Sequence, residues 1–125
     1  MLAFDTNYLL RYLLNDDEDQ SRQVTQVVEK QKTQQAQIRL LDLVLMETSW
    51  VLQSVYGFGR KELSLVLEDL LNDPIFSFDD SSRLWKALGM YQNGKADFDD
   101  YLILAQSATL GLKLQTFDKK LQREI

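Results

Sequence analysis

Short apolar runs alternate with longer segments of helical spacing along the whole chain. Four runs predict short β-strands: residues 1–4, 36–41, 75–78 and 112–116. Apolar residues recur at helical spacing in six longer segments: residues 8–14, 18–30, 42–55, 60–71, 81–91 and 97–110. Strands that alternate with helices predict an α/β fold, in which helices cover both faces of a parallel sheet.

Polar residues and glycines mark the ends of these predicted helices. Asp42 is expected to cap the helix that starts beside it, and Asn93-Gly94 is expected to turn the chain between two helices. Gly111 is expected to close the helix that precedes the fourth strand.

The composition predicts one ordinary globular domain that spans residues 1–125. Hydrophobic residues make up 45% of the chain and charged residues 26%, and a domain of this length buries roughly two-thirds of its unfolded surface. No apolar run approaches the roughly 20 residues that span a bilayer, and Asp5 interrupts the first apolar run, so neither a membrane helix nor a signal peptide is expected. We therefore expect a cytoplasmic protein.

Cysteine and histidine are both absent from the chain. This excludes disulfides, zinc–thiolate sites, thiol nucleophiles and histidine bases, and leaves carboxylates, lysines, hydroxyls or a bound ion for any catalysis. The net charge of −5 argues at first against a nucleic-acid partner. It does not exclude one, because acidic residues gathered around bound cations lower the net charge while they attract phosphate locally.

Glu47 occupies an unusual position in the helical pattern. Its neighbours three and four residues away are Leu43, Val44, Trp50 and Val51, which places the carboxylate on an apolar stripe. A buried, ionised carboxylate costs several kcal/mol unless a cation or hydrogen-bond donors compensate it. The alternative is an edge position, from which the side chain reaches water or an arginine.

Asp5 and Asp118 each follow a predicted strand. Ligands of open parallel sheets bind beyond the carboxyl ends of the strands, so both positions suit a functional site. Each aspartate could equally be the N-cap of the helix that follows it.

Two further acids, Asp97 and Asp100, stand three residues apart at the start of a helix and share a face, whereas Asp99 is expected to point into solvent. Acids in a first helical turn are favoured by the helix dipole, which is the alternative explanation for either one alone. If the acids converge, each pair about 5 Å apart repels by roughly 3 kcal/mol at an effective dielectric near 20. An all-oxygen site of this kind suits Mg²⁺ or Mn²⁺.

Four fragments in this order resemble PIN-domain proteins, and most of all the VapC-type ribonuclease toxins of type II toxin–antitoxin systems. They are Asp5-Thr6-Asn7, residues 45–52, residues 96–103 and residues 114–118. The resemblance covers nearly the whole chain. It implies a three-layer α/β/α domain whose central parallel sheet has four or five short strands flanked by helices.

The resemblance also implies a ribonuclease site that holds one or two Mg²⁺ or Mn²⁺ ions. By position, the metal-binding and catalytic acids are Asp5, Glu47, Asp100 and Asp118, with Asp97 as a further catalytic acid. Polar residues that support the acids are Thr6, Asn7 and Thr116. Arg11, Lys119 and Lys120 are candidate contacts for the RNA backbone, although each could be plain solvated surface.

Large side chains also suggest a docking groove for a partner. A small core does not readily hide all of Tyr8, Tyr12, Trp50, Tyr56 and Phe58. The resemblance implies a cognate antitoxin whose basic C-terminal segment would lie beside Tyr12, Trp50 and Phe58, together with a homodimer of the toxin. The alternative for these side chains is internal packing.

Three other functions remain open at this point. A PIN-like module could bind RNA or protein without cleaving it, and a nuclease could process RNA without an antitoxin. A receiver-like signalling domain also carries acids at strand ends, but its pattern has no place for Glu47 on a helix.

Overall fold

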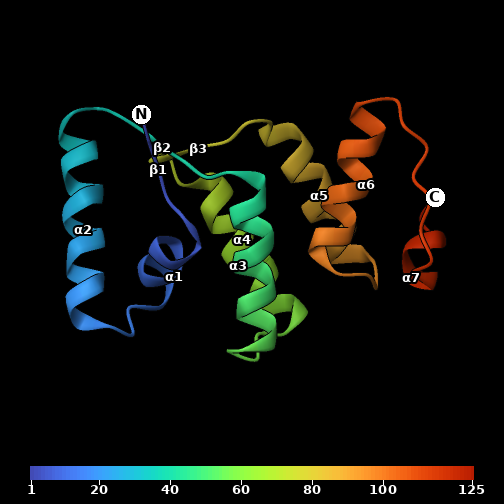
Figure 1. Ribbon diagram of the computed structural model, residues 1–125, viewed down its shortest axis with the longest axis horizontal. Coiled ribbons are helices and arrows are strands. Elements are labelled where there is room, and N and C mark those ends of the chain that lie inside the picture. The colour runs from blue at the N-terminus through green and yellow to red at the C-terminus, as the bar shows by residue number, and fades with distance from the viewer.

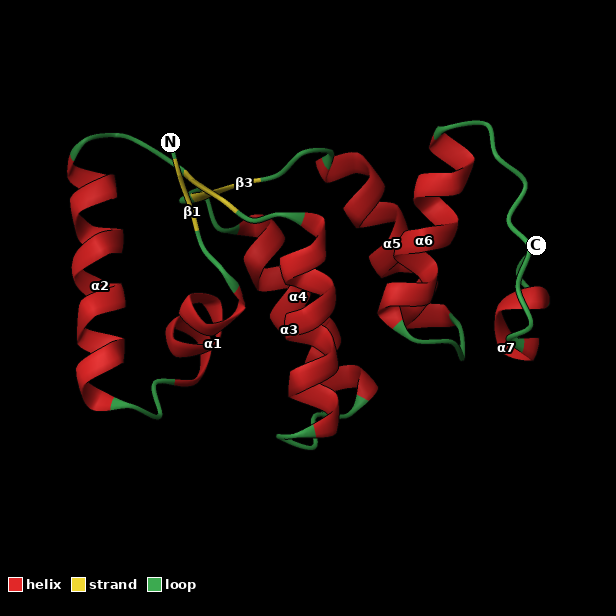
Figure 2. Ribbon diagram, viewed as in Figure 1, coloured by secondary structure: helices red, strands yellow, loops and turns green.

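A short parallel sheet lies near one edge of the molecule in the computed structural model, which describes residues 1–125 (Figure 2). Its strands are β1 (Leu2–Ala3), β2 (Ile38–Arg39) and β3 (Phe76–Ser77), in the order β1-β2-β3. Leu2 is in register with Ile38, and Ile38 with Phe76. Ile38 and Phe76 are buried, so β2 and β3 contribute directly to the core.

Seven helices make up most of the molecule and lie below and to either side of this sheet in the view of Figure 1. Their bounds are α1 (Thr6–Leu14), α2 (Glu18–Thr33), α3 (Asp42–Ser54), α4 (Arg60–Asn72), α5 (Ser81–Asn93), α6 (Phe98–Thr109) and α7 (Lys119–Gln122). In Figure 1, α1 and α2 lie at one end, α3 and α4 in the middle, and α5, α6 and α7 towards the other end. No helix is both long enough and apolar enough to cross a membrane.

The alternation of helices with parallel strands confirms the predicted α/β class, but the sheet has three strands where four or five were predicted. Residues 112–116 form no strand, and the backbone amides of residues 113–117 donate no backbone–backbone hydrogen bond. Figure 1 gives the reason, because this segment lies beyond α6, far from the sheet. Residues 112–116 have the alternating pattern of a strand, but no neighbouring strand lies close enough to pair with them.

Arg83 ties the starts of α3 and α5 together. Its side chain is only 9% exposed and donates to Asp42 Oδ2 at 2.7 Å, and it also lies within 4.0 Å of Asp79 and Asp80. The hydrogen bond to Asp42 raises the pKa of this guanidinium further. The predicted capping role of Asp42 is therefore wrong, because α3 begins at Asp42 itself and Leu41 is the N-cap.

Candidate active site

The turn that leads into α6 is held by Arg60. The guanidinium of Arg60 donates to the carbonyl oxygens of Tyr91 and Ala96, each at 2.7 Å, and it lies 4.1 Å from the centroid of the Tyr91 ring. Charge-assisted bonds of this type are stronger than neutral ones. The backbone just before Asp97 is therefore fixed by a side chain that lies far away in the sequence.

Tyr101 holds the same turn from the other side. Its buried hydroxyl accepts from the amides of Lys95 and Ala96 at 3.1 and 3.3 Å, and it donates to Glu124 Oε1 at 3.1 Å. Gly94 makes room for this ring, since a Cβ at Gly94 would clash with the hydroxyl oxygen. A side chain at this position would push directly against the hydrogen-bonded hydroxyl.

The turn presents three carboxylates at the start of α6. Asp97, Asp99 and Asp100 each offer one oxygen, and these oxygens lie within 4.8 Å of one another. The Asp97 amide donates to Asp100 Oδ2 at 3.3 Å, and the Asp100 amide donates to Asp99 Oδ1 at 3.1 Å. Asp99 was expected to point into solvent, but it is half-buried and belongs to this cluster.

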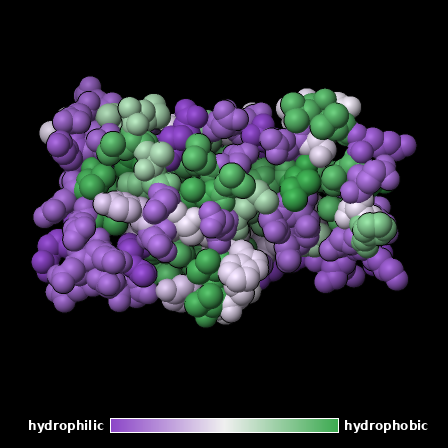
Figure 3. Space-filling model, viewed as in Figure 1, coloured by the Kyte–Doolittle hydropathy of each residue, from purple (hydrophilic) through white to green (hydrophobic).

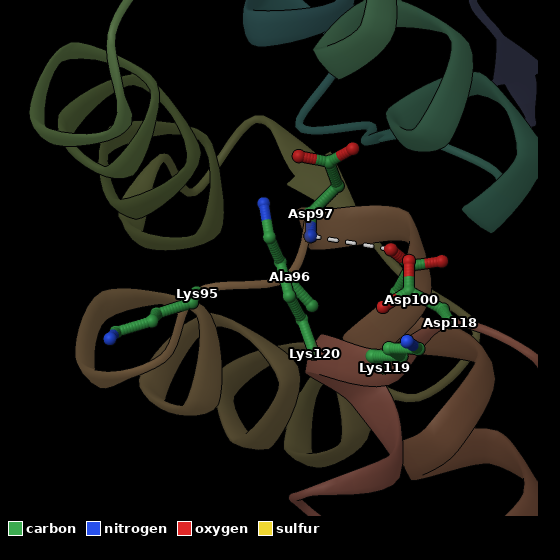
Figure 4. Close-up of a pocket in the computed structure, with 7 residues that line it drawn as sticks. All are labelled: Lys95, Ala96, Asp97, Asp100, Asp118, Lys119 and Lys120. Carbon is green, nitrogen blue, oxygen red and sulfur yellow. Dashed lines mark hydrogen bonds between the residues drawn. The ribbon is translucent and has the colours of Figure 1, made fainter.

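Asp118 brings a fourth carboxylate to the same place. It caps α7, with its Oδ1 accepting from the Leu121 amide at 3.0 Å, and its own amide donates to Thr116 Oγ1 at 3.0 Å. Asp97, Asp100 and Asp118 line one pocket together with Lys95, Ala96, Lys119 and Lys120 (Figure 4). In Figure 4, Asp100 and Asp118 lie next to each other with Lys119 beside them, whereas Lys95 points away.

The negative charge of this cluster is not neutralised within the chain. No lysine or arginine forms a salt bridge with Asp97, Asp99, Asp100 or Asp118, although Lys119 and Lys120 line the pocket. Burial raises the pKa of the Asp100 carboxyl, and the charge of Asp99 raises it further, with smaller contributions from Asp118 and Asp97. The pocket is therefore a concentration of repelling carboxylates.

Asp5 and Glu47 form a second, separate group. Asp5 caps α1, with its Oδ1 accepting from the Tyr8 amide at 2.9 Å, and Thr6 Oγ1 donates to Glu47 Oε1 at 3.3 Å. Neither acid lines the pocket of Asp100. In Figure 1 the junction of β1 and α1 lies on one side of α3, and the start of α6 lies on the other. The structure thus gathers the predicted acids in two groups rather than one.

Glu47 lies on the solvent-facing side of α3, which corrects the expectation of a buried position. Of the four residues that define the stripe, Leu43 and Trp50 are 70% and 62% exposed, and only Val44 is buried. The buried face of the helix is centred instead on Leu45, Thr48 and Leu52. Because α3 carries apolar residues on more than one face, its sequence does not reveal which face is buried.

The other predicted site residues differ in whether their side chains are available to contact a ligand. The guanidinium of Arg11 donates to Asp16 and Gln20, both at 2.7 Å, so it is already engaged within the chain and is not free to contact RNA. Lys119 and Lys120 are exposed at the pocket, where they can reach a ligand. Asn7 is exposed and lines a separate pocket with Asp5.

The predicted groove residues are not equally accessible. Tyr12 is half-buried, donates to Asp73 Oδ2 at 2.8 Å and packs edge-on against Phe76. It therefore packs internally, which was the alternative to a place in the groove. Phe58 is also half-buried against the core. Trp50 is the exposed member of the three.

Sequence reasoning missed Lys95, Arg60 and Tyr101, which build or line this site. Lys95 adjoins Ala96-Asp97, and that proximity was an available signal. The roles of Arg60 and Tyr101 depend on backbone groups that only the fold brings near them.

The chain belongs to the PIN domain family, which matches residues 2–124. Among curated proteins it is similar to a VapC ribonuclease of Aquifex aeolicus (strain VF5), with 24% identity over 113 residues, which cover 90% of this chain and 83% of that protein. No solved structure matches the chain significantly. The family match removes the receiver-like alternative.

Proposed function

We propose that this protein is a Mg²⁺- or Mn²⁺-dependent endoribonuclease that hydrolyses RNA phosphodiester bonds in the cytoplasm, and that it is the toxin of a toxin–antitoxin pair. The observation that carries the proposal is the pocket between α6 and α7, where carboxylates crowd together without a cationic partner. Membership of the PIN family and the similarity to a VapC ribonuclease support this class of reaction.

The residues of the pocket fit a hard divalent cation. All donors at the start of α6 are carboxylate oxygens, which Mg²⁺ and Mn²⁺ prefer. The raised pKa of Asp100 reports negative charge that a cation would compensate. Asp97, Asp99, Asp100 and Asp118 would hold the ion on this side, and Asp5 and Glu47 are proposed to complete the site.

The chain's own groups suit phosphodiester hydrolysis around such an ion. When bound, a divalent cation polarises the phosphate and lowers the pKa of water. Lys119 and Lys120 would hold the RNA backbone at the mouth of the pocket.

A cleavage assay on single-stranded RNA tests this function. Cleavage should require Mn²⁺ or Mg²⁺ and stop with a chelator, and Asp100→Asn and Glu47→Gln should abolish it. The matched control is Asp69→Asn, which replaces an exposed acid of α4 away from the pocket and should keep full activity. RNA binding without metal-dependent cleavage by the wild type would instead support the non-catalytic alternative.

The toxin role implies a cognate antitoxin, and the exposed apolar side chains of α3 are the proposed contact. Leu43 and Trp50 stand on its solvent face on either side of Glu47, so an apolar segment with a basic residue would match this surface. A protein encoded next to this one should inhibit cleavage, and Trp50→Ala should weaken that inhibition without loss of cleavage. A locus without such a neighbour would favour a solitary RNA-processing nuclease.

A further inference from the structure

One edge of the sheet is open at β1. This strand pairs with β2 on one side and with no strand on the other. Beside that free edge lies a wholly apolar pocket lined by Leu2, Ala3, Phe4, Tyr8 and Val27, and Leu2 is 44% exposed. An open edge with an adjacent apolar surface is a template for another strand.

Residues 112–117 of the same molecule have the sequence pattern of a strand but pair with no other strand. Leucines at 112 and 114 alternate with Lys113 and Gln115, as in a strand with one buried face. Leu112 is 61% exposed and Phe117 fully exposed. Apolar side chains gather on the surface at the C-terminal end of α6, where this segment begins (Figure 3).

The segment is held away from the β1 edge of its own chain. It leaves the end of α6, and α7 anchors its far end through buried Leu121 and the bond between Glu124 and Tyr101. In Figure 1 it lies at one end of the molecule, and α3, α5 and α6 lie between it and β1. A second molecule has no such restriction, and a symmetric pair can exchange both segments at once.

We propose that residues 112–116 of a second copy of this chain add to the free edge of β1 as a parallel strand, so that the active site is assembled from two chains. In a parallel pair the carboxyl ends lie at the same edge, so Asp118 of one copy would come beside Asp5 of the other. Asp5 already lies next to Thr6, which holds Glu47. This pairing unites the two groups of acids, and it deepens the proposed nuclease function, on which its catalytic consequence rests.

Cross-linking tests the strand exchange independently of catalysis. Alignment of Asp118 with Asp5 places Gln115 opposite Leu2, and the chain has no cysteine of its own. Leu2→Cys mixed with Gln115→Cys under a mild oxidant should give a disulfide-linked dimer. Leu2→Cys mixed with Asp69→Cys should give none. A cross-link that forms only within single molecules of the Leu2→Cys/Gln115→Cys double variant, or no cross-link at all, would overturn the exchange.

Complementation tests the shared site. Asp5→Asn and Asp118→Asn should each be inactive alone. When they are refolded together, about a quarter of the sites should be intact, because half of the dimers are mixed and each mixed dimer has one site without a substitution. If each chain held its own complete site, no activity would return and the shared site would be refuted. Loss of cleavage by the wild type would count against the nuclease function, while the cross-link would still decide the exchange.

Discussion

Gly94 should not tolerate even a methyl group. An alanine Cβ would clash with the hydroxyl oxygen of Tyr101, and it would lie 2.6 Å from the Cζ of Tyr101 and 2.8 Å from the carbonyl oxygen of Met90. Two of these atoms belong to a buried ring, and the third is backbone, so none moves freely. The φ at Gly94 is −109°, which other residues also adopt, so the cost comes from the lack of space.

The loss of stability in Gly94→Ala depends on which groups must move to make room for the methyl group. Overpacking of a filled core costs about 1–3 kcal/mol. If the Tyr101 hydroxyl withdraws, it also leaves the amides of Lys95 and Ala96, and each lost hydrogen bond costs about 1 kcal/mol. We therefore expect Gly94→Ala to lose about 3–5 kcal/mol, which lowers Tm by roughly 10–20 °C for a domain of this size.

Gly89→Ala is the matched control. Gly89 lies inside α5, and a Cβ there would meet nothing within 4 Å. Alanine in a helix interior should therefore stabilise the protein by about 0.5–1 kcal/mol. Thermal unfolding followed by circular dichroism compares the two variants, and RNA cleavage shows whether the turn before Asp97 has moved. Equal melting of Gly94→Ala and wild type would refute the proposed close packing.

Three further predictions concern charge, metal and pH. Asp100→Asn should raise Tm at pH 7 without metal, because the pKa of Asp100 in the folded protein lies above the ordinary 3.8 and its ionised carboxylate therefore destabilises the fold above that pH. The Tm values of the variant and the wild type should converge in acid, and a lower Tm of the variant at pH 7 would contradict this prediction. Mn²⁺ at a hundredfold its Kd should stabilise the wild type by about 2.7 kcal/mol, and an unchanged melt would count against the metal site. Tyr12→Phe should lose about 1–2 kcal/mol with its bond to Asp73. Burial raises the pKa of Tyr12 to about 12, so wild-type stability should fall between pH 10.0 and about 12, and urea unfolding of Tyr12→Phe should lack that fall.

Helix positions could be predicted from the sequence because their signals are local. The helix expected to end near Tyr91 is α5, which Asp80 caps through a bond to the Arg83 amide and which ends at Asn93. Asp97 and Asp100 were likewise placed correctly at the start of α6. Spacing and capping act within one or two turns, so the neighbouring residues suffice.

Strand partners and buried faces depend on residues that are distant in the sequence. Residues 112–116 have the pattern of a strand, but pairing requires an edge that the chain must bring to them. The exposure of Glu47 could not be predicted for the same reason, because the tertiary fold decides which side of α3 is buried. The positioning role of Arg60 depends on two carbonyls more than 30 residues away.

The use of arginines in the fold has a consequence for how this protein would bind nucleic acid. Arg11, Arg60 and Arg83 are engaged within the chain, which leaves Lys119 and Lys120 at the pocket to meet phosphates. Each phosphate that a protein neutralises releases counterions, so affinity for single strands falls with salt at a slope of about −0.7 per contact. With Lys119 and Lys120 as the two contacts, the slope should be about −1.4. Affinity for RNA should therefore depend less on ionic strength than it does for a protein with a broad basic surface.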